Sequence, residues 1–146
     1  MPTPYRHRQF SRYAVGSFVA VTILMGLAFF SHGFELPMLP VFLGMVAFLA
    51  GFHFVVTFLT VEVSERELMW HFGGGFWRKR IARSDIARVE RVRLPWWYGI
   101  GIKYMRPAWV YLVAPGAGIE VALTNGEVVR IGTDDPDGLA AALKAV

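Results

Sequence analysis

A continuous apolar segment from Pro40 to Thr60 constrains this chain more than any other part of its sequence. No Asp, Glu, Lys or Arg occurs between Leu36 and Val61. A helix rises about 1.5 Å per residue, so roughly 20 such residues cross the hydrocarbon core of a bilayer. A helix packed on the core of a small soluble protein keeps one polar face, and this segment has none. The sequence therefore predicts a transmembrane helix over about residues 38–60.

Another apolar segment without formal charge, from Ala14 to Phe34, precedes it. A cleaved signal peptide is the alternative interpretation, since basic residues lie before this segment. Against that, the segment is long, and no small-x-small cleavage motif follows it. The connection over 35–40 is short and contains two prolines, which suits a turn before a helix start. We therefore expect a transmembrane helical hairpin over residues 13–60, with helices at about 13–34 and 38–60.

Positive charge is distributed unevenly around these two segments. Arg6, Arg8 and Arg12 lie before the first helix and a basic region follows the second, whereas the connection contains no Lys or Arg. Cytoplasmic flanks of transmembrane helices carry the excess of Lys and Arg. We therefore expect both termini in the cytoplasm, with residues 1–12 forming a basic cytoplasmic N-terminus.

Small residues inside the predicted helices suggest how these helices pack. Gly16 with Ala20, and Ala47 with Gly51, have small-xxx-small spacing. This spacing favours close packing of the two helices on each other and is equally consistent with dimerisation.

His53 is the only titratable side chain well inside either predicted helix. The functional interpretation is an intramembrane proton or ligand site. No acidic residue lies at the same depth, so we expect a neutral imidazole that is hydrogen-bonded to the other helix or lies near the headgroups.

After Thr60 the apolar residues recur with a period of two. Val61 and Val63 alternate with Glu62, and a second alternating run follows from Leu68 to Phe72. This pattern predicts a β-hairpin with one buried face. The run Gly73-Gly74-Gly75 lies between strands and lacks the Lys-Ser/Thr of a phosphate-binding loop, so we expect turn glycines.

A second predicted hairpin surrounds Asn125-Gly126. A two-residue turn would pair Val121 with Arg130 and mix the two faces. A three-residue loop with Gly126 in a left-handed bulge keeps the apolar residues on one face. Further on, Asp135 suits the cap of a helix that has Pro136 at its first position. Residues 61–146 are therefore expected to form a small, mainly-β barrel or sandwich of roughly seven short strands with one C-terminal α-helix.

This order of elements is similar to that of the pleckstrin-homology-like (PH-like) domains of bacterial membrane proteins. The residues that carry the resemblance are Ile81 with Ile86, residues 98–102, residues 109–111, Glu120 with Asn125-Gly126, and residues 131–136. Many of these proteins have a pair of transmembrane helices before the domain. The resemblance implies a cytoplasmic PH-like domain anchored in the inner membrane, and it supplies no catalytic residue.

The sequence offers little for catalysis. It contains no cysteine, its serines lie in no nucleophile-elbow context, and no pair of histidines has metal-ligand spacing. Asp134, Asp135 and Asp137 lie at the predicted helix start, where capping and the helix dipole explain them. We therefore expect no enzymatic activity, no cofactor and no metal site.

Charge is strongly segregated along the chain, although the net charge is only +4. Residues 78–106 hold nine Lys/Arg against Asp85 and Glu90, whereas acidic residues are in excess over 60–77 and 107–146. A basic middle between acidic ends predicts one positive face. We define the predicted binding surface as eight of these basic residues with three tryptophans in or next to the region: Arg78, Lys79, Arg80, Arg83, Arg91, Arg93, Lys103, Arg106, Trp77, Trp96 and Trp97.

A membrane tether would hold this surface near lipid headgroups. Juxtamembrane basic residues contribute about 1 kcal/mol each near an anionic leaflet, and Trp favours the membrane interface. We therefore expect a non-enzymatic module that recognises anionic headgroups or a protein partner. The alternative is a structural subunit of a homo-oligomer or larger membrane complex. Nucleic acid is disfavoured as a partner, because the domain is tethered at the bilayer and acidic segments flank the basic region.

Overall fold

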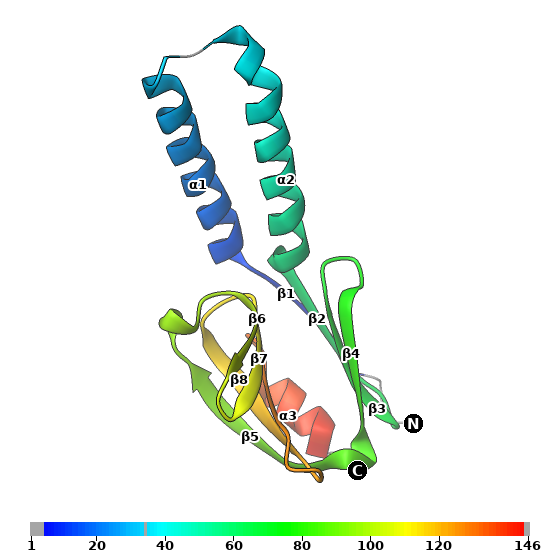
Figure 1. The fold of residues 1–146 in the computed structure, drawn as a ribbon. Coiled ribbons are helices and arrows are strands. Elements are labelled where there is room, and N and C mark those ends of the chain that lie inside the picture. Colours follow the sequence, from blue (N-terminus) through cyan, green and yellow to red (C-terminus); the bar gives the residue numbers. More distant parts are fainter. Residues whose placement is uncertain (1–4, 34, 145–146) are drawn as a thin grey trace.

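The computed structural model describes residues 5–33 and 35–144 (Figure 1). A long helical hairpin stands on one end of a β-domain. The helices are α1 (Arg12–Ser31), α2 (Leu39–Thr57) and α3 (Pro136–Lys144), with short 3-10 helices η1 (Leu36–Met38), η2 (Arg83–Asp85) and η3 (Trp96–Tyr98). The strands are β1 (Tyr5–Phe10), β2 (Phe58–Val63), β3 (Glu67–Phe72), β4 (Phe76–Ala82), β5 (Ile86–Leu94), β6 (Gly101–Met105), β7 (Ala108–Leu112), β8 (Gly116–Leu123) and β9 (Val128–Gly132).

Helix α1, and the continuous segment Leu36–Thr57 formed by η1 and α2 together, are each long and apolar enough to cross a membrane. Only 6% of the most apolar 18-residue stretch of each segment is buried inside the molecule. The core helix of a soluble protein, in contrast, is mostly buried. The helices are shorter than expected at their C-terminal ends. Helix α1 ends at Ser31. Helix α2 ends at Thr57, because the chain enters strand β2 at Phe58. The expected end of the first helix, Phe34, lies outside the described residues.

Large side chains pack α1 against α2. The rings of Phe29 and Phe42 lie 4.8 Å apart, and those of Phe18 and His53 lie 5.4 Å apart. The small-residue pairs predicted for this contact do not lie in it. Apart from the adjacent residues and the backbone of the same helix, no described atom lies within 4 Å of where a Cβ on Gly16 or Gly51 would be. Ala20 and Ala47 are exposed as well. The spacing motif alone could not identify the packed face, because bulky residues occupy it.

The first sheet contains β1, β2, β3 and β4 in that order, all antiparallel. The predicted hairpin is confirmed, with Val61 opposite Trp70 and Val63 opposite Leu68. Strand β1 was not predicted, because residues 1–12 were expected to form a basic cytoplasmic N-terminus. Strand β1 pairs with β2 over its whole length, so Tyr5–Phe10 are part of the β-domain.

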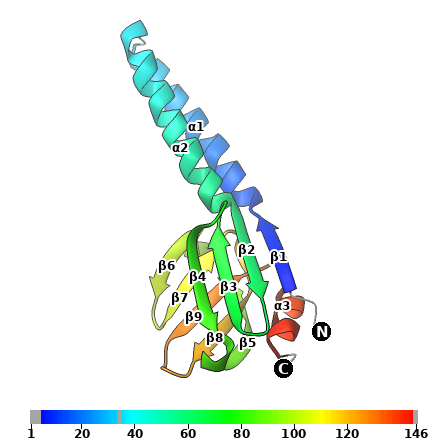
Figure 2. The ribbon, with the colours of Figure 1, turned by 90° about the vertical axis from the view of Figure 1, so that its right-hand side faces the viewer.

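Both helices therefore rise directly from neighbouring strands (Figure 2). The backbone N–H of Ser11, which follows β1, donates to the carbonyl of Thr57, which precedes β2, over 2.8 Å. The turn between β3 and β4 also touches α2: a Cβ added to Gly73 would lie 3.2 Å from Cα of Val55. These two contacts hold the β-domain against the ends of the helices without a linker.

The second sheet has the order β5-β8-β9-β7-β6, in which β7 and β9 are parallel and the other pairs are antiparallel. Val121 lies opposite Val129, and the N–H of Leu123 donates to the carbonyl of Glu127 over 2.8 Å. Gly126 has φ +89°. The predicted three-residue loop with a left-handed glycine is therefore confirmed.

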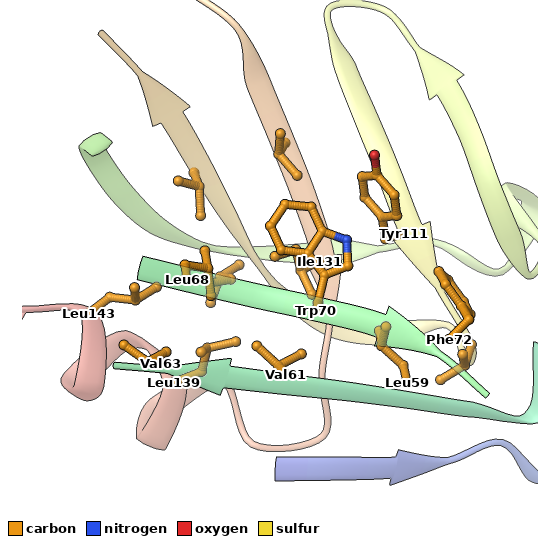
Figure 3. Close-up of a cluster of buried hydrophobic side chains, with 14 residues drawn as sticks. Leu59, Val61, Val63, Leu68, Trp70, Phe72, Tyr111, Ile131, Leu139 and Leu143 are labelled. Atoms are coloured by element: carbon orange, nitrogen blue, oxygen red, sulfur yellow. The ribbon is translucent and has the colours of Figure 1, made fainter. Parts of the chain in front are cut away.

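The two sheets and α3 enclose the main core (Figure 3). Trp70, Leu68 and Leu59 from the first sheet face Ile131 and other apolar residues of the second, and all of these are almost completely buried. A smaller cluster around Leu94, Val110 and Leu112 lies apart from the main core, and Tyr98 of η3 packs against it. Of the two predicted alternatives, barrel or sandwich, the β-domain is an open sandwich with its C-terminal helix.

Candidate functional site

Four residues of the predicted binding surface lie together on strand β4. Trp77, Arg78, Lys79 and Arg80 are all exposed. Among the described strands, β4 pairs only with β3, so it forms an edge of the first sheet. Strand β6 is an edge of the second sheet in the same way. The two edges are not joined to each other, which leaves the sandwich open between them.

A cleft of about 980 Å³ lies along this opening. Its walls are residues 77–82 of β4 and residues from β6 and β7, including Ile102 and Trp109. Trp70 and Phe72 of β3 also line it, and Phe52 and Val56 of α2 line it at the helical end. The cleft therefore runs from the end of α2 into the space between the two sheets.

The register of β4 places its side chains on alternate faces. Lys79 lies opposite Trp70, and Ile81 lies opposite Leu68. Directly opposed residues in a sheet share a face, so Lys79 lies on the same side as the buried Trp70. Arg78 and Arg80 belong to the other face. Lys79 is therefore the basic residue of β4 that faces the space between the sheets.

Two polar groups lie among the apolar residues of the cleft floor. Trp70 is 1% exposed, and its indole Nε1 has no hydrogen-bond partner in the described part of the chain. Its nitrogen edge is turned toward Tyr111 (Figure 3), and the two rings are 5.1 Å apart. Burial raises the pKa of the Tyr111 hydroxyl, and the negative charge of Glu127 raises it further. The indole N–H and the Tyr111 hydroxyl are therefore two hydrogen-bond donors among the residues that line the cleft.

The remaining residues of the predicted surface are dispersed. Lys103 lines the cleft and donates to the carbonyl of Tyr98. Arg91 forms an ion pair of 2.6 Å with Asp137 on α3. Arg83 donates to the carbonyls of Leu143, over 2.8 Å, and Ser64, over 3.1 Å.

Arg93, Trp96, Trp97 and Arg106 lie outside the cleft lining. Trp96 and Trp97 are 76% and 66% exposed in η3. Figure 1 shows this segment on the side of the β-domain nearer the helices. The structure thus divides the predicted surface into a group at the cleft, the pair Trp96 and Trp97 near the helices, and the remaining residues, of which Arg83 and Arg91 make other contacts.

Sequence reasoning missed one residue near the ends of the helices and two residues of the cleft. In the sequence, Arg8 was considered only as a charge that flanks a helix. In the structure it belongs to β1 and lies opposite Thr60 of β2, and its guanidinium lies 4.0 Å from the Phe58 ring centroid. Trp109 and Tyr111 were expected simply as strand residues. The alternation of apolar residues marks a buried face, but it carries no information about which strands become sheet edges.

A polar cluster joins β1 to the start of α3. Asp135 accepts a hydrogen bond from the backbone of Gly138 over 3.0 Å and another from the hydroxyl of Tyr5 over 3.0 Å. The Gly138 N–H, and then the Tyr5 hydroxyl, hold the pKa of Asp135 below its usual range. His7 lies 2.5 Å from Asp134. Capping of α3 by Asp135 is as predicted, and the pairing with β1 explains why these residues lie together.

His53 has the environment expected of a structural residue. Its Nδ1 lies 3.0 Å from the carbonyl of Leu49, and its Nε2 lies 3.2 Å from the hydroxyl of Ser17 on α1. A carbonyl can only accept, so Nδ1 donates to Leu49. The Ser17 hydroxyl lies between Nε2 and the carbonyl of Ala14, to which it donates over 2.9 Å. The predicted hydrogen bond to the other helix is confirmed.

Comparison of this chain with protein-family models, with curated proteins and with solved structures finds no match.

Proposed function

We propose that this chain is a membrane-anchored, non-enzymatic binding module. Two transmembrane helices hold a PH-like domain at the cytoplasmic face of the inner membrane, where the domain recognises anionic lipid headgroups. The uneven distribution of Lys and Arg supports this orientation: Arg8 and Arg12 lie at the β-domain end of the helices, while the η1 connection has no basic residue.

The observation that carries the proposal is the direct joint between the helices and the β-domain. The hydrogen bond from Ser11 to Thr57 leaves no flexible linker that could move the domain away from the bilayer. Strand residues advance by about 3.3 Å each, so Arg8, opposite Thr60, lies about 10 Å from the end of α2. The headgroup layer extends roughly 5–7 Å beyond the hydrocarbon core, so Arg8 lies within one Debye length, about 8 Å at physiological salt, of the charged headgroups. Basic residues at this end therefore act on the leaflet.

Aromatic residues support the same geometry. Phe76 lies opposite Phe72, which lies opposite Leu59, two residues after the end of α2. The adjoining Trp77 is 62% exposed. An exposed Trp gains free energy at the interface because its amphipathic ring suits both headgroups and acyl chains. These aromatic residues would therefore help to seat the β-domain on the membrane.

The test uses the full-length protein, because an excised domain starting at residue 60 would lose β1 and expose the edge of β2. Hydrogen exchange of the backbone is measured in nanodiscs of neutral phosphatidylcholine and in nanodiscs that also contain anionic phosphatidylglycerol. We expect slower exchange in β4 and in residues 94–98 in the anionic nanodiscs, with the difference falling as salt is added. Each charge near the leaflet contributes about 1 kcal/mol, or about fivefold in the docking equilibrium.

Charge-reversal variants provide the matched comparison. Arg8→Glu and Arg78→Glu should reduce the protection, whereas Arg66→Glu should not. Arg66 lies in the turn between β2 and β3, at the end of β2 that is remote from the helices. Equal exchange in both types of nanodisc, or an equal effect of all three variants, would contradict the proposal.

A structural role in an assembly is the second candidate. The exposed pairs Gly16 with Ala20 and Ala47 with Gly51 leave surfaces on the helices where another helix can approach closely. Cross-linking in cells and the mass of the protein in mild detergent test this role. A monomer without cross-linked partners would exclude it.

A further inference from the structure

We infer that the cleft between β4 and the β6–β7 hairpin binds the head group of one anionic phospholipid. The phosphate lies near Lys79, an acceptor oxygen of the lipid receives the N–H of Trp70, and the acyl chains leave along α2. This inference rests on the proposed function and deepens it, because it replaces a general attraction to the leaflet by a single defined site.

The position of the cleft supports a ligand that comes from the bilayer. Phe52 and Val56 belong to the apolar part of α2, and they line the same cleft as β4 and β6. Phe52 is 51% exposed. A lipid can therefore enter from the side while its acyl chains remain beside α2. A polar ligand from solution would gain no free energy from the apolar residues of α2 at this entrance.

The charges at the cleft favour an anionic head group. Arg78, Lys79, Arg80 and Lys103 line it, against Asp85 and Glu127. Lys79 lies on the inner face of β4, beside the buried Trp70. An ammonium group on a flexible stem is well suited to a phosphate. Asp85 and Glu127 lie at the end of the cleft remote from the helices, because β5 begins and β8 ends there, and can accept from hydroxyl groups of the head group.

The floor of the cleft supplies the most specific observation. A buried donor without a partner costs free energy, and phenylalanine would fill much of the same space without this cost. The indole N–H of Trp70 is such a donor, and Trp70 lines the cleft. A lipid phosphate or ester oxygen placed there would satisfy it.

Native mass spectrometry of the full-length protein tests the stoichiometry. The protein in mild detergent is incubated with phosphatidylglycerol, with phosphatidylcholine or with glycerol 3-phosphate, and the mass of each complex is read. We expect one retained phosphatidylglycerol per chain and little retention of the other two. Lys79→Ala and Trp70→Phe should each lower retention by about fivefold to tenfold, as expected for loss of a charged or buried hydrogen bond. Arg66→Ala should leave it unchanged.

A spectroscopic readout separates a direct contact from a loss of folding. The indole N–H resonance of Trp70, identified by its disappearance in Trp70→Phe, should move when phosphatidylglycerol is added to the wild-type protein. No movement, or equal movement with glycerol 3-phosphate, would overturn the inference. Retention of a co-purifying peptide on β4 in place of lipid would overturn it too.

The two proposals fail in different ways. If β4 is protected in anionic nanodiscs but no lipid is retained, the defined site is wrong and the membrane-facing role stands. If protection and retention are both absent, both proposals are wrong. Ile102→Trp, which adds bulk to the β6 wall of the cleft, should abolish retention while the salt-dependent protection of residues 94–98 persists.

Discussion

The hydroxyl of Ser11 donates a hydrogen bond to the carbonyl of Val113. Ser11 is completely buried, and the same oxygen accepts from the N–H of Ala14 over 3.0 Å as the N-cap of α1. Its backbone joins Thr57. One small side chain thus connects the start of a helix to the second sheet, while its main chain connects the two helices to each other.

Replacing Ser11 with Ala should destabilise the β-domain by about 2 kcal/mol, because the helix loses its cap and the Val113 carbonyl loses a partner in a buried site. The measurement is denaturant unfolding in mild detergent, followed by tryptophan fluorescence. Ser31→Ala serves as the control, since the Ser31 hydroxyl bonds to its own helix at an exposed position. An equal loss of unfolding free energy in both variants would show that the buried hydrogen bonds of Ser11 stabilise the protein no more than the exposed hydroxyl of Ser31.

Arg83 belongs to the predicted binding surface, but its contacts give it a structural role. It bridges the turn after β2 to the carbonyl of Leu143 near the end of α3. Arg83→Ala should lower the free energy of unfolding by about 1 kcal/mol and leave lipid retention unchanged. Arg106→Ala, in the exposed turn between β6 and β7, should change neither. Reduced lipid retention in Arg83→Ala would contradict this and show that Arg83 takes part in lipid binding.

Asp135 should make the stability of the β-domain depend on pH in the acid range. Its pKa is depressed in the folded state by the Gly138 N–H and then by the Tyr5 hydroxyl. A depressed carboxyl pKa stabilises the fold above the unfolded value of about 4 and loses that effect as the pH falls through the folded pKa. Asp135→Asn should cost about 0.5–1 kcal/mol at pH 7 and almost nothing at pH 2–3. A pH-independent difference would contradict this assignment.

Trp77 has φ +45°, and it is the only described residue other than glycine with a positive φ. It lies where the register between β3 and β4 shifts. A bulky side chain in this conformation costs about 1–2 kcal/mol. Trp77→Gly should therefore raise the free energy of unfolding by about 1 kcal/mol, and it should reduce the protection of β4 in anionic nanodiscs. A less stable variant would show that packing of the indole outweighs the backbone strain.

The hairpins of the β-domain could be predicted from the sequence because their partners are close along the chain. Val61 and Trp70 are nine positions apart, and alternation with a short turn leaves one register that keeps apolar residues together. The loop around Gly126 followed from the same reasoning. Strand β1 could not be found in this way, since Arg6 and Arg8 have the appearance of a charged flank and their partners follow two helices.

The cleft depends on long-range pairings that no local pattern encodes. Its walls exist because β7 lies parallel to β9, which places β6 at an edge, and because β4 finds no second partner among the described strands. Trp70 has the pattern of any buried strand residue. Its unpaired indole nitrogen becomes evident when the neighbours of the ring are known.

The pairing of β1 with β2 has a consequence for how the protein is made. Phe10 pairs with Phe58, 48 positions later, so strand β1 cannot pair with β2 until both long helices have been synthesised. Closing so long a loop costs entropy in a disordered chain, but two helices packed side by side already bring its ends together. We therefore expect the association of α1 with α2 to precede the pairing of β1 with β2, because it removes most of this entropy cost.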